Sequence, residues 1–348
     1  MSSPSSSDAF SDIVGWDVGG AHLKVARVDA AGKVLAVEQF PCQLWHGMER
    51  LQQAVEAATR KLGNAAQHAV TMTGELADIF PSRHDGVLEI STAMQRLLLD
   101  ARVRFYAGES GLIEPAQVPK HTSQIASANW LASSQFVAQV VPNALLIDMG
   151  STTTDIIKIQ DGTAQPQGLT DAARLTTSEL VYSGLIRTPV MAMVQRVPFN
   201  GQMQRIAAEH FATMADVYRL TGKLEAEHDM SDTADGKGKS PPDSARRLAR
   251  MVGHDAEDAP LLAWQALAHF IASAQLQDLA AAAQTVAASL QSDSPIVGAG
   301  VGRAVVRQIA QKSGRPYIDF ADLIEGEARE WAAVCAPAYA VAWLAGNS

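Results

Sequence analysis

Three short apolar runs follow one another near the start of the chain, at residues 12–17, 23–28 and 34–40. Turn-forming residues separate the runs: Gly19 and Gly20 come first, and the stretch Asp-Ala-Ala-Gly-Lys at 29–33 comes second. Apolar runs of this length between turn residues are typical of β-strands joined by tight turns. We therefore expect an antiparallel meander of three strands.

Helical spacing and short apolar runs alternate after this meander. In the segment 49–62, for example, Leu51, Val55, Ala58 and Leu62 fall on one face of a helix. The same criteria predict helices at 49–62, 90–99 and 123–137, and strands at 68–72 and 103–106. The first part of the chain therefore predicts the order βββαβαβα.

The pattern then begins again. An apolar run at 144–148 ends in an Asp, small residues follow, and a second run at 156–159 leads into the turn 160–162 and an extended stretch at 164–168. A supersecondary unit used twice is an internal repeat, which indicates a duplicated architecture. We expect two similar lobes that face each other across a cleft.

The remaining residues predict further helices around a polar loop. We expect a helix near 177–183, an extended segment at 188–199 that ends in the turn Asn200-Gly201, a polar loop at 228–242, a basic helix at 244–252, an Ala-rich helix at 261–290, strands at 296–297 and 317–318, and helices at 304–312 and 328–344, the last broken near Pro337. The expected organisation is a tail at 1–11, a first lobe at 12–140 and a second lobe at 141–348, with an insertion of helices and loops at about 200–290.

Composition narrows the class of partner. A chain of 348 residues suits two lobes, and its formal charge of −9 argues against nucleic acid and anionic membranes as ligands. Cys42 and Cys335 are far apart, so no zinc site or disulfide framework is indicated. The start of the chain lacks the features of a signal peptide, and the apolar stretch 331–344 is too short for a bilayer span. We expect a cytoplasmic protein with small-molecule substrates, and the sequence is compatible with a homo-oligomer.

The first candidate site is the segment from Asp17 to Lys24. Gly19 and Gly20 allow backbone N–H groups to approach a phosphate, since no Cβ stands in the way. The Asp17 carboxylate can hold a hydrated metal ion, and Lys24 can bind phosphate. The alternative is an ordinary hairpin turn.

The second candidate repeats this plan at Asp148, with Gly150 and the hydroxyl side chains of Ser151, Thr152 and Thr153. Hydroxyls can donate hydrogen bonds to phosphate oxygens, although a simple β-turn is the alternative. The two segments together are stronger evidence for a phosphate site than either segment alone, because each opens a hairpin after an acidic residue. We expect a phosphate-bearing ligand between them, with Asp17 and Asp148 as catalytic and metal-binding residues.

A third segment is rich in glycine. Gly298, Gly300 and Gly302 lie between a short strand and a helix, where backbone N–H groups can bind an anion. The spacing is not that of a dinucleotide-binding motif, and a tight strand-to-helix turn is the alternative.

The fourth segment, 71–78, follows a strand, so Glu75 lies where open α/β sheets place their ligands. Glu75 is a candidate general base or ligand of a metal-bound water. In the alternative interpretation Thr73 caps a helix and Glu75 favours its N-terminus.

The fifth candidate is the polar loop and the helix after it. Its charged residues can clamp a metal–diphosphate, or they form a solvated flap. They are Asp229, Asp235, Lys237, Lys239, Arg246 and Arg247.

These motifs together resemble one branch of the actin-like ATPase and sugar-kinase superfamily, the hydantoinase/oxoprolinase-like proteins linked to tetrahydromethanopterin-dependent one-carbon metabolism. The resemblance extends from about residue 13 to 344, and its motifs are 17–20, 71–78 with Gly86-Val87, 148–155, 179–190 and 233–239. It implies an α/β fold of two ribonuclease H-like lobes, each built on a βββαβα unit, with a cleft between them.

The resemblance also implies a transferase of methanofuran or methylofuran biosynthesis. Such an enzyme joins an aminomethylfuran-methyl diphosphate to a phenol derived from tyramine (γ-glutamyl-tyramine) or tyrosine, and diphosphate leaves. Mg²⁺ and backbone N–H groups would stabilise the diphosphate, Glu75 would be the base, and Asp17 or Asp148 would hold metal-bound water.

Two other functions stay open. Ala21 stands where many sugar kinases have a hydroxyl residue, which weakens a role in binding the ATP γ-phosphate, yet the glycines at 298–302 are compatible with ATP. The chain is thus also a candidate ATP-dependent kinase or hydantoinase-like ATP-coupled hydrolase. The second of these other functions is that of a non-catalytic, nucleotide-binding scaffold subunit.

Overall fold

The computed structural model describes residues 12–99 and 101–347, so the expected tail lies outside the described residues. The contacts divide the chain into two compact units. Unit 1 comprises the described residues up to Asn143, the segment Ile159–Gln165 and the residues from Asp319 onward. Unit 2 comprises Ala144–Lys158 and Pro166–Ile318.

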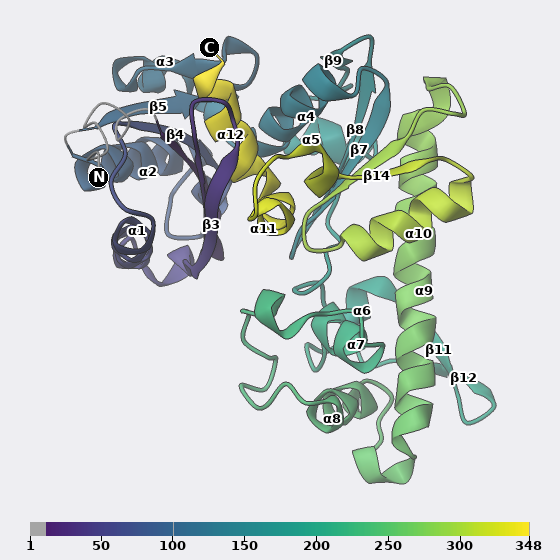
Figure 1. Ribbon diagram of the computed structural model, residues 1–348. Helices are drawn as coiled ribbons and strands as arrows, with labels where there is room; N and C mark the ends of the chain where they lie inside the picture. Colours follow the sequence, from purple (N-terminus) through teal and green to yellow (C-terminus); the bar gives the residue numbers. More distant parts are fainter. Residues whose placement is uncertain (1–11, 100, 348) are drawn as a thin grey trace, which may run out of the picture. The chain divides into compact units, whose positions relative to one another are not determined.

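Unit 1 is built on a mixed sheet with the strand order β3-β2-β1-β4-β5-β6 (Figure 1). The strands are β1 (Ile13–Val18), β2 (His22–Val28), β3 (Val34–Pro41), β4 (Gln67–Met72), β5 (Arg102–Tyr106) and β6 (Leu112–Ile113). β1, β2 and β3 pair antiparallel, whereas β4 runs parallel to both β1 and β5. The expected meander is confirmed.

The helices that precede β7 (Ala144–Met149) in unit 1 follow the expected order, except that one expected helix is divided in two. The helices of unit 1 are α1 (Glu49–Leu62), α2 (Arg83–Leu97), α3 (Val118–Ile125), α4 (Asn129–Val140), α11 (Arg329–Val334) and α12 (Ala336–Gly346). The single helix expected at 123–137 is wrong, because the chain breaks between α3 and α4, where Ser127 has a φ of 52°. The expected apolar face of α1, which includes Leu51 and Val55, is buried.

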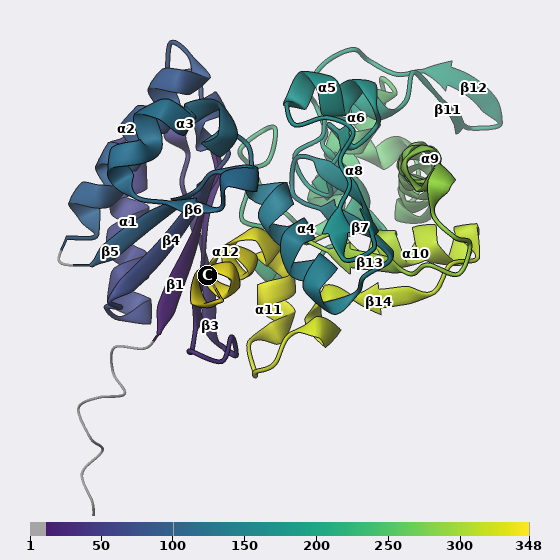
Figure 2. The same cartoon turned by 90° about the horizontal axis from the view of Figure 1, so that it is seen from above.

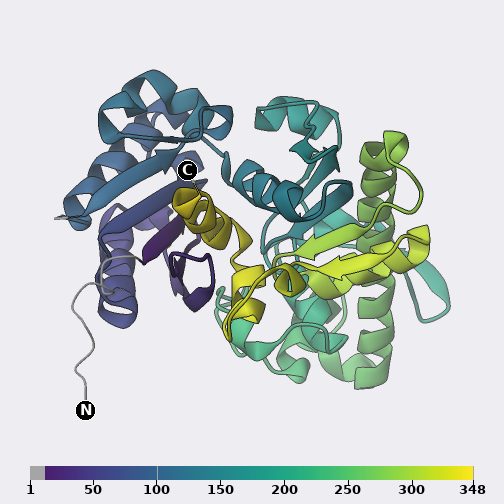
Figure 3. The same cartoon turned by 45° about the horizontal axis from the view of Figure 1, so that its top comes forward.

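The C-terminal helix packs within unit 1, although residues 319–348 were expected in the second lobe. Helix α12, the yellow helix that ends at the label C in Figure 3, crosses one face of the sheet over β1. Gly15 permits this approach, since a Cβ at that position would lie 2.0 Å from the Ala338 carbonyl oxygen. Small residues on both elements thus decide which unit the last helix joins.

Unit 2 contains the second sheet, with the strand order β10-β8-β7-β13-β14. The strands are β7 (Ala144–Met149), β8 (Thr154–Gln160), β10 (Leu180–Val181), β13 (Ile296–Ala299) and β14 (Tyr317–Asp319). β7 and β13 are parallel neighbours. The stretch expected to be extended at 164–168 forms the two-residue strand β9 (Thr163–Ala164), which pairs with the end of β8.

The helices of unit 2 include the long helix α9, which is seen end-on in Figure 2. They are α5 (Asp171–Thr176), α6 (Val190–Met193), α7 (Met214–Leu220), α8 (Pro241–Met251), α9 (Leu261–Val286) and α10 (Arg303–Ser313). α9 packs against α7, α8 and α10, and its Trp264, Leu267 and Ile271 side chains are buried. None of the helices in the described residues, α9 included, combines the length and the apolar character that crossing a bilayer requires.

Local sequence explains two details of unit 2. The hairpin of β11 (Arg196–Phe199) and β12 (Gln202–Arg205) turns at Asn200 and Gly201, whose φ angles of 49° and 76° suit these residue types. The helix expected near 177–183 is wrong. Thr170 caps the earlier helix α5, and Ser178, with a φ of 63°, turns the chain toward β10.

Candidate functional site

The first glycine loop joins β1 to β2 in unit 1. The Gly19 N–H donates a hydrogen bond to the His22 carbonyl oxygen at 3.0 Å, and a Cβ on Gly19 would lie 2.8 Å from that oxygen. A Cβ on Gly20 would meet no atom within 4 Å. Gly19 is therefore required by the turn itself, whereas the space beside Gly20 is open to a ligand.

Asp17 lies at the end of β1 and is 4% exposed. Its register partners are Lys24 on β2 and Thr71 on β4. Residues paired across neighbouring strands have their side chains on the same face of the sheet. The structure therefore brings the expected carboxylate and the expected cation, Asp17 and Lys24, next to each other.

The turn after β4 packs against this loop. The Thr73 N–H donates to the Val18 carbonyl oxygen at 2.9 Å, and a Cβ on Gly74 would lie 3.1 Å from the same oxygen. A short 3₁₀ helix, Gly74–Leu76, follows, and the Thr73 side chain makes no capping hydrogen bond to it. The expected cap by Thr73 is therefore wrong, because the Thr73 backbone rather than its hydroxyl holds the turn.

Glu75 is enclosed, with an exposed fraction of 1%. Its Oε1 accepts a hydrogen bond from the Ser127 hydroxyl at 2.7 Å. Gly86 of α2 lies directly against it, since a Cβ there would be 2.8 Å from the Glu75 Cα. The carboxylate is thus fixed in place at the edge of the sheet where β1 and β4 end.

The second glycine loop joins β7 to β8 in unit 2. Asp148 is the penultimate residue of β7 and is 8% exposed, and the Gly150 N–H donates to the Thr153 carbonyl oxygen at 2.9 Å. The side chains of Ser151, Thr152 and Thr153 are partly exposed. The expected hydroxyls therefore lie at the surface of the loop, where an anion can reach them.

The third glycine segment closes over the second loop. A Cβ on Gly300, which has a φ of 81°, would lie 2.3 Å from the Asp148 Oδ1 and 2.4 Å from the Met149 carbonyl oxygen. The Gly302 N–H donates to that carbonyl oxygen at 2.8 Å. Gly298 instead faces Tyr317, whose hydroxyl would lie 2.5 Å from an added Cβ. The second and third glycine segments, which were expected as separate candidates, thus lie against each other in unit 2.

A further segment of unit 2 supports the same loop, although it was not among the expected site residues. The N–H groups of Leu185 and Arg187 donate to the carbonyl oxygens of Gly150 and Ser151 at 3.0 and 2.8 Å. A Cβ on Gly184 would lie 2.5 Å from the Ser151 carbonyl carbon. We call Ser183–Thr188 the bracing segment. Its signals in the sequence were a glycine without an evident turn and its place within the family motif 179–190.

Gln275 of α9 holds the bracing segment from inside. This side chain is fully buried, and its Nε2 donates to the Ser183 hydroxyl at 2.7 Å and to the Gly184 carbonyl oxygen at 2.9 Å. The Tyr218 hydroxyl donates to the Gln275 Oε1 at 2.6 Å, and burial raises the pKa of that phenol above its ordinary value. A polar side chain in the middle of the Ala-rich helix thus positions the loop.

The expected diphosphate clamp forms an ion network in unit 2. Arg247 is fully buried, and its guanidinium donates to Asp216 at 2.8 Å and to Asp235 at 2.9 Å. Asp235 therefore has a pKa below its ordinary value, since the Lys237 N–H and Arg247 outweigh the effect of burial. Arg247 therefore ties the polar loop, through Asp235, to α8, and its side chain does not reach solvent.

The other members of the clamp are paired in part. Asp229 accepts hydrogen bonds from Arg219 at 2.6 and 2.8 Å, and Lys239 lies 3.3 Å from its Oδ1. Arg246 pairs with Asp243. Lys237 is exposed. A clamp remains a prediction for the more exposed lysine and arginine, Lys237 and Arg246.

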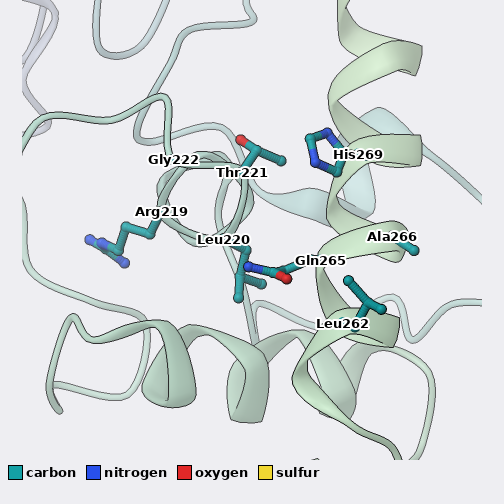
Figure 4. A pocket seen from close by; sticks show the side chains of 8 residues that line it. All are labelled: Arg219, Leu220, Thr221, Gly222, Leu262, Gln265, Ala266 and His269. Atoms are coloured by element: carbon teal, nitrogen blue, oxygen red, sulfur yellow. The ribbon is translucent and has the colours of Figure 1, made fainter.

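A pocket of about 450 Å³ lies beside this network, between the end of α7 and α9 (Figure 4). Its lining includes Arg219, Thr221, Gln265 and His269, and Leu262 is 75% exposed there. The pocket contains none of the residues expected to bind phosphate. It therefore does not change the assignment of the glycine loops.

Two groups of side chains suit a metal ion. The Asp148 carboxylate and the neighbouring Ser151 and Thr152 hydroxyls are oxygen donors, which Mg²⁺ prefers. Glu225, Glu227 and His228 place their ligand atoms within 4.8 Å of one another, and both glutamates are exposed. The first group fits the expected Mg²⁺ better, because imidazole is a ligand of transition metals rather than of Mg²⁺.

Comparison with known proteins finds two similar synthases. The (4-{4-[2-(gamma-L-glutamylamino)ethyl]phenoxymethyl}furan-2-yl)methanamine synthase of Methanocaldococcus jannaschii is 30% identical over 246 residues, which are 70% of this chain and 72% of that protein. The synthase of the same name from Methanococcus vannielii is 36% identical over 123 residues, which are 35% of this chain and 55% of that protein.

Among solved structures, nucleotide-free acetone carboxylase aligns over 95% of this chain and 70% of that chain, with a TM-score of 0.61 and 10% identity. This likeness concerns the fold. Together with the strand orders, it confirms the expected α/β fold class. Residues 66–345 match the model of the hydantoinase/oxoprolinase proteins, and the chain is therefore an enzyme that belongs to the hydantoinase/oxoprolinase family.

Proposed function

We propose that this enzyme is a transferase of methanofuran-type cofactor biosynthesis, in the tetrahydromethanopterin-linked one-carbon pathway. Its likeness to two synthases that are named for a phenoxymethylfuran amine carries the proposal. The substrates would be an aminomethylfuran-methyl diphosphate and a phenol derived from tyramine or tyrosine. Their reaction forms an aryl ether and releases diphosphate.

The bond that breaks joins the furan-methyl carbon to a diphosphate oxygen, and the bond that forms joins the same carbon to the phenol oxygen. The furan ring stabilises positive charge on that carbon, so the protein has to assist mainly the departure of diphosphate. The phenol proton passes to a base, for which Glu75 is our candidate. Burial and the hydrogen bond from Ser127 hold its carboxylate in one orientation.

The second glycine loop supports the assignment of the diphosphate. Ser151 and Thr152 present hydroxyls at its surface, and Gly300 allows a backbone to lie against Asp148. Mg²⁺, when bound, would neutralise charge on the diphosphate oxygens, and Asp148 is the residue of this loop that would hold it. In unit 1 the corresponding role would fall to Asp17.

A ³¹P NMR assay tests this function. The protein is incubated with Mg²⁺, an aminomethylfuran-methyl diphosphate and either γ-glutamyl-tyramine or tyrosine, and each substrate alone serves as the control. We expect diphosphate and the ether product in equal amounts. If neither phenol gives diphosphate release above the controls, the proposed function is wrong.

One observation favours a second function, an ATP-dependent kinase or hydrolase. The third glycine segment lies against the Asp148 loop, through Gly300 and Gly302, and forms a second backbone surface there. Such a surface suits the phosphates or the ribose of a nucleotide. Formation of ADP that depends on an added substrate would support this function over the transfer reaction.

A further inference from the structure

Arg187 projects from the bracing segment at the second glycine loop. Its backbone N–H donates to the Ser151 carbonyl oxygen at 2.8 Å, and its Nη1 donates to the Thr152 hydroxyl at 3.5 Å. Thr152 is one of the residues expected to bind phosphate. The end of the arginine side chain thus lies beside the place assigned to the anion.

The backbone around Arg187 is fixed from both sides. The preceding Ile186 accepts a hydrogen bond from the Ala215 N–H at 3.1 Å, and the following Thr188 accepts one from the Met214 N–H at 2.8 Å. Ile186 and Thr188 are buried, whereas Arg187 is exposed. A cation on so rigid a backbone is preorganised for a ligand, because little conformational entropy remains to be lost on binding.

The charge of this side chain suits the ligand. A diphosphate brings several negative charges to a loop that already contains the Asp148 carboxylate, so a cation is needed there. Partial desolvation by the surrounding atoms lowers the pKa of the Arg187 guanidinium below its ordinary value, and an arginine in a protein still carries its charge at neutral pH. A guanidinium can bind two phosphate oxygens at once, which a lysine ammonium cannot do in the same geometry.

We propose that Arg187 binds the leaving diphosphate at the second glycine loop and stabilises the charge that develops as it departs. This role rests on the proposed function for the identity of the substrate. The position of the guanidinium follows from the contacts of the bracing segment and does not depend on that function.

Binding of inorganic diphosphate with Mg²⁺, measured by calorimetry, tests the proposal without turnover. Arg187→Met should weaken binding about 10- to 100-fold, since it removes a charge-assisted hydrogen bond, and Arg187→Lys should lie between this variant and the wild type. Arg196→Met on the exposed edge of β11 is the matched control and should bind as the wild type. Equal diphosphate affinity in wild type and Arg187→Met would overturn the proposal.

Turnover separates this proposal from the proposed function. In the furan-diphosphate assay Arg187→Met should lower kcat more than it raises the KM for the phenol, because the lost contact acts on the leaving group. If the wild type turns over and the Arg187→Met variant is equally active, the role of Arg187 is wrong and the proposed function stands. A wild type that binds diphosphate through Arg187 but makes no ether keeps the role and overturns the function.

Discussion

The backbone of Gly184 lies directly on the backbone of Ser151, at a distance that excludes any side chain. A Cβ on Gly184 would stand 2.5 Å from the Ser151 carbonyl carbon, and the Thr154 hydroxyl donates to the neighbouring Ser183 carbonyl oxygen at 2.6 Å. The glycine loop after β7 is therefore not held by its own hairpin alone. The bracing segment fixes its shape, and α9 in turn fixes the bracing segment through Gln275.

Gly184→Ala should displace the loop. The methyl group overlaps backbone atoms that cannot rotate away, so we expect a loss of about 1–3 kcal/mol in the free energy of unfolding and a large fall in diphosphate affinity. Gly20→Ala is the control for stability, because a Cβ there meets no atom within 4 Å. Chemical denaturation of both variants checks this prediction, and equal stability of the two would contradict it.

Gln275→Leu should act on the loop from a distance. It leaves the Gly184 carbonyl oxygen and the Tyr218 hydroxyl without their buried partner, which we expect to cost about 2–3 kcal/mol. Gln277→Leu, at an exposed position of the same helix, should leave stability unchanged. Urea unfolding and diphosphate binding measure the two effects. A Gln275 variant as stable as the Gln277 variant would show that the network does not contribute.

Asp148→Asn should abolish turnover and leave the fold intact, because it removes charge without changing volume. We expect kcat to fall by about 100-fold or more if the carboxylate holds the metal. Asp161→Asn is the control, since Asp161 is exposed in a turn with a φ of 53°, which Asn adopts readily. Activity near that of the wild type in Asp148→Asn would return Asp148 to a structural role.

Local sequence was sufficient to predict the longer strands and the two acids near their ends. Asp17 and Asp148 each lie near the end of a buried run, two residues before a glycine, and both features depend on neighbours in the sequence. The contact of Gly300 with Asp148 follows from the parallel pairing of β13 with β7, in which Ala299 is the register partner of Asp148. Such contacts become predictable once strand order is known.

Other parts of the site depend on packing between distant segments. Gln275 is a lone polar residue in an Ala-rich stretch, and nothing near it in sequence indicates Gly184 as its partner. Arg247 belongs to a run of charges that resembles a solvated surface, yet Asp216 and Asp235 neutralise it in the interior. The packing of α12 in unit 1 likewise depends on a distant contact, the close approach of Ala338 to Gly15.

Two buried tyrosines provide a test of hydrogen-bond energetics. Within the part of the chain that the structure describes, the Tyr106 hydroxyl has no hydrogen-bond partner, whereas the Tyr339 hydroxyl donates to the Gly32 carbonyl oxygen at 3.0 Å. Tyr106→Phe should therefore leave stability unchanged or raise it by up to about 1 kcal/mol, and Tyr339→Phe should lower it by about 1–2 kcal/mol. Thermal unfolding of the two variants tests this prediction. A Tyr106→Phe variant that is less stable than Tyr339→Phe would contradict the hydrogen-bond assignment of the two hydroxyls.

His68 should make the stability of the protein depend on pH. This side chain is 6% exposed, and its Nδ1 accepts a hydrogen bond from the Trp16 indole at 3.0 Å. Burial is the main cause that lowers its pKa from 6.5 to about 4, so the folded protein keeps the imidazole neutral. Above pH 6.5 the imidazole is neutral in both states and the full stability is present.

As pH falls from 6.5 toward 4, the unfolded chain takes up a proton that the folded protein does not. The free energy of unfolding should then decrease by about 3 kcal/mol from this residue, with no further change below pH 4. His68→Gln removes the titrating group, so its loss of stability between pH 6.5 and 4 should be smaller than that of the wild type by this amount. Urea unfolding over the pH range measures the difference. Parallel curves for the two proteins would mean that His68 is already protonated in the folded state or is not buried in solution.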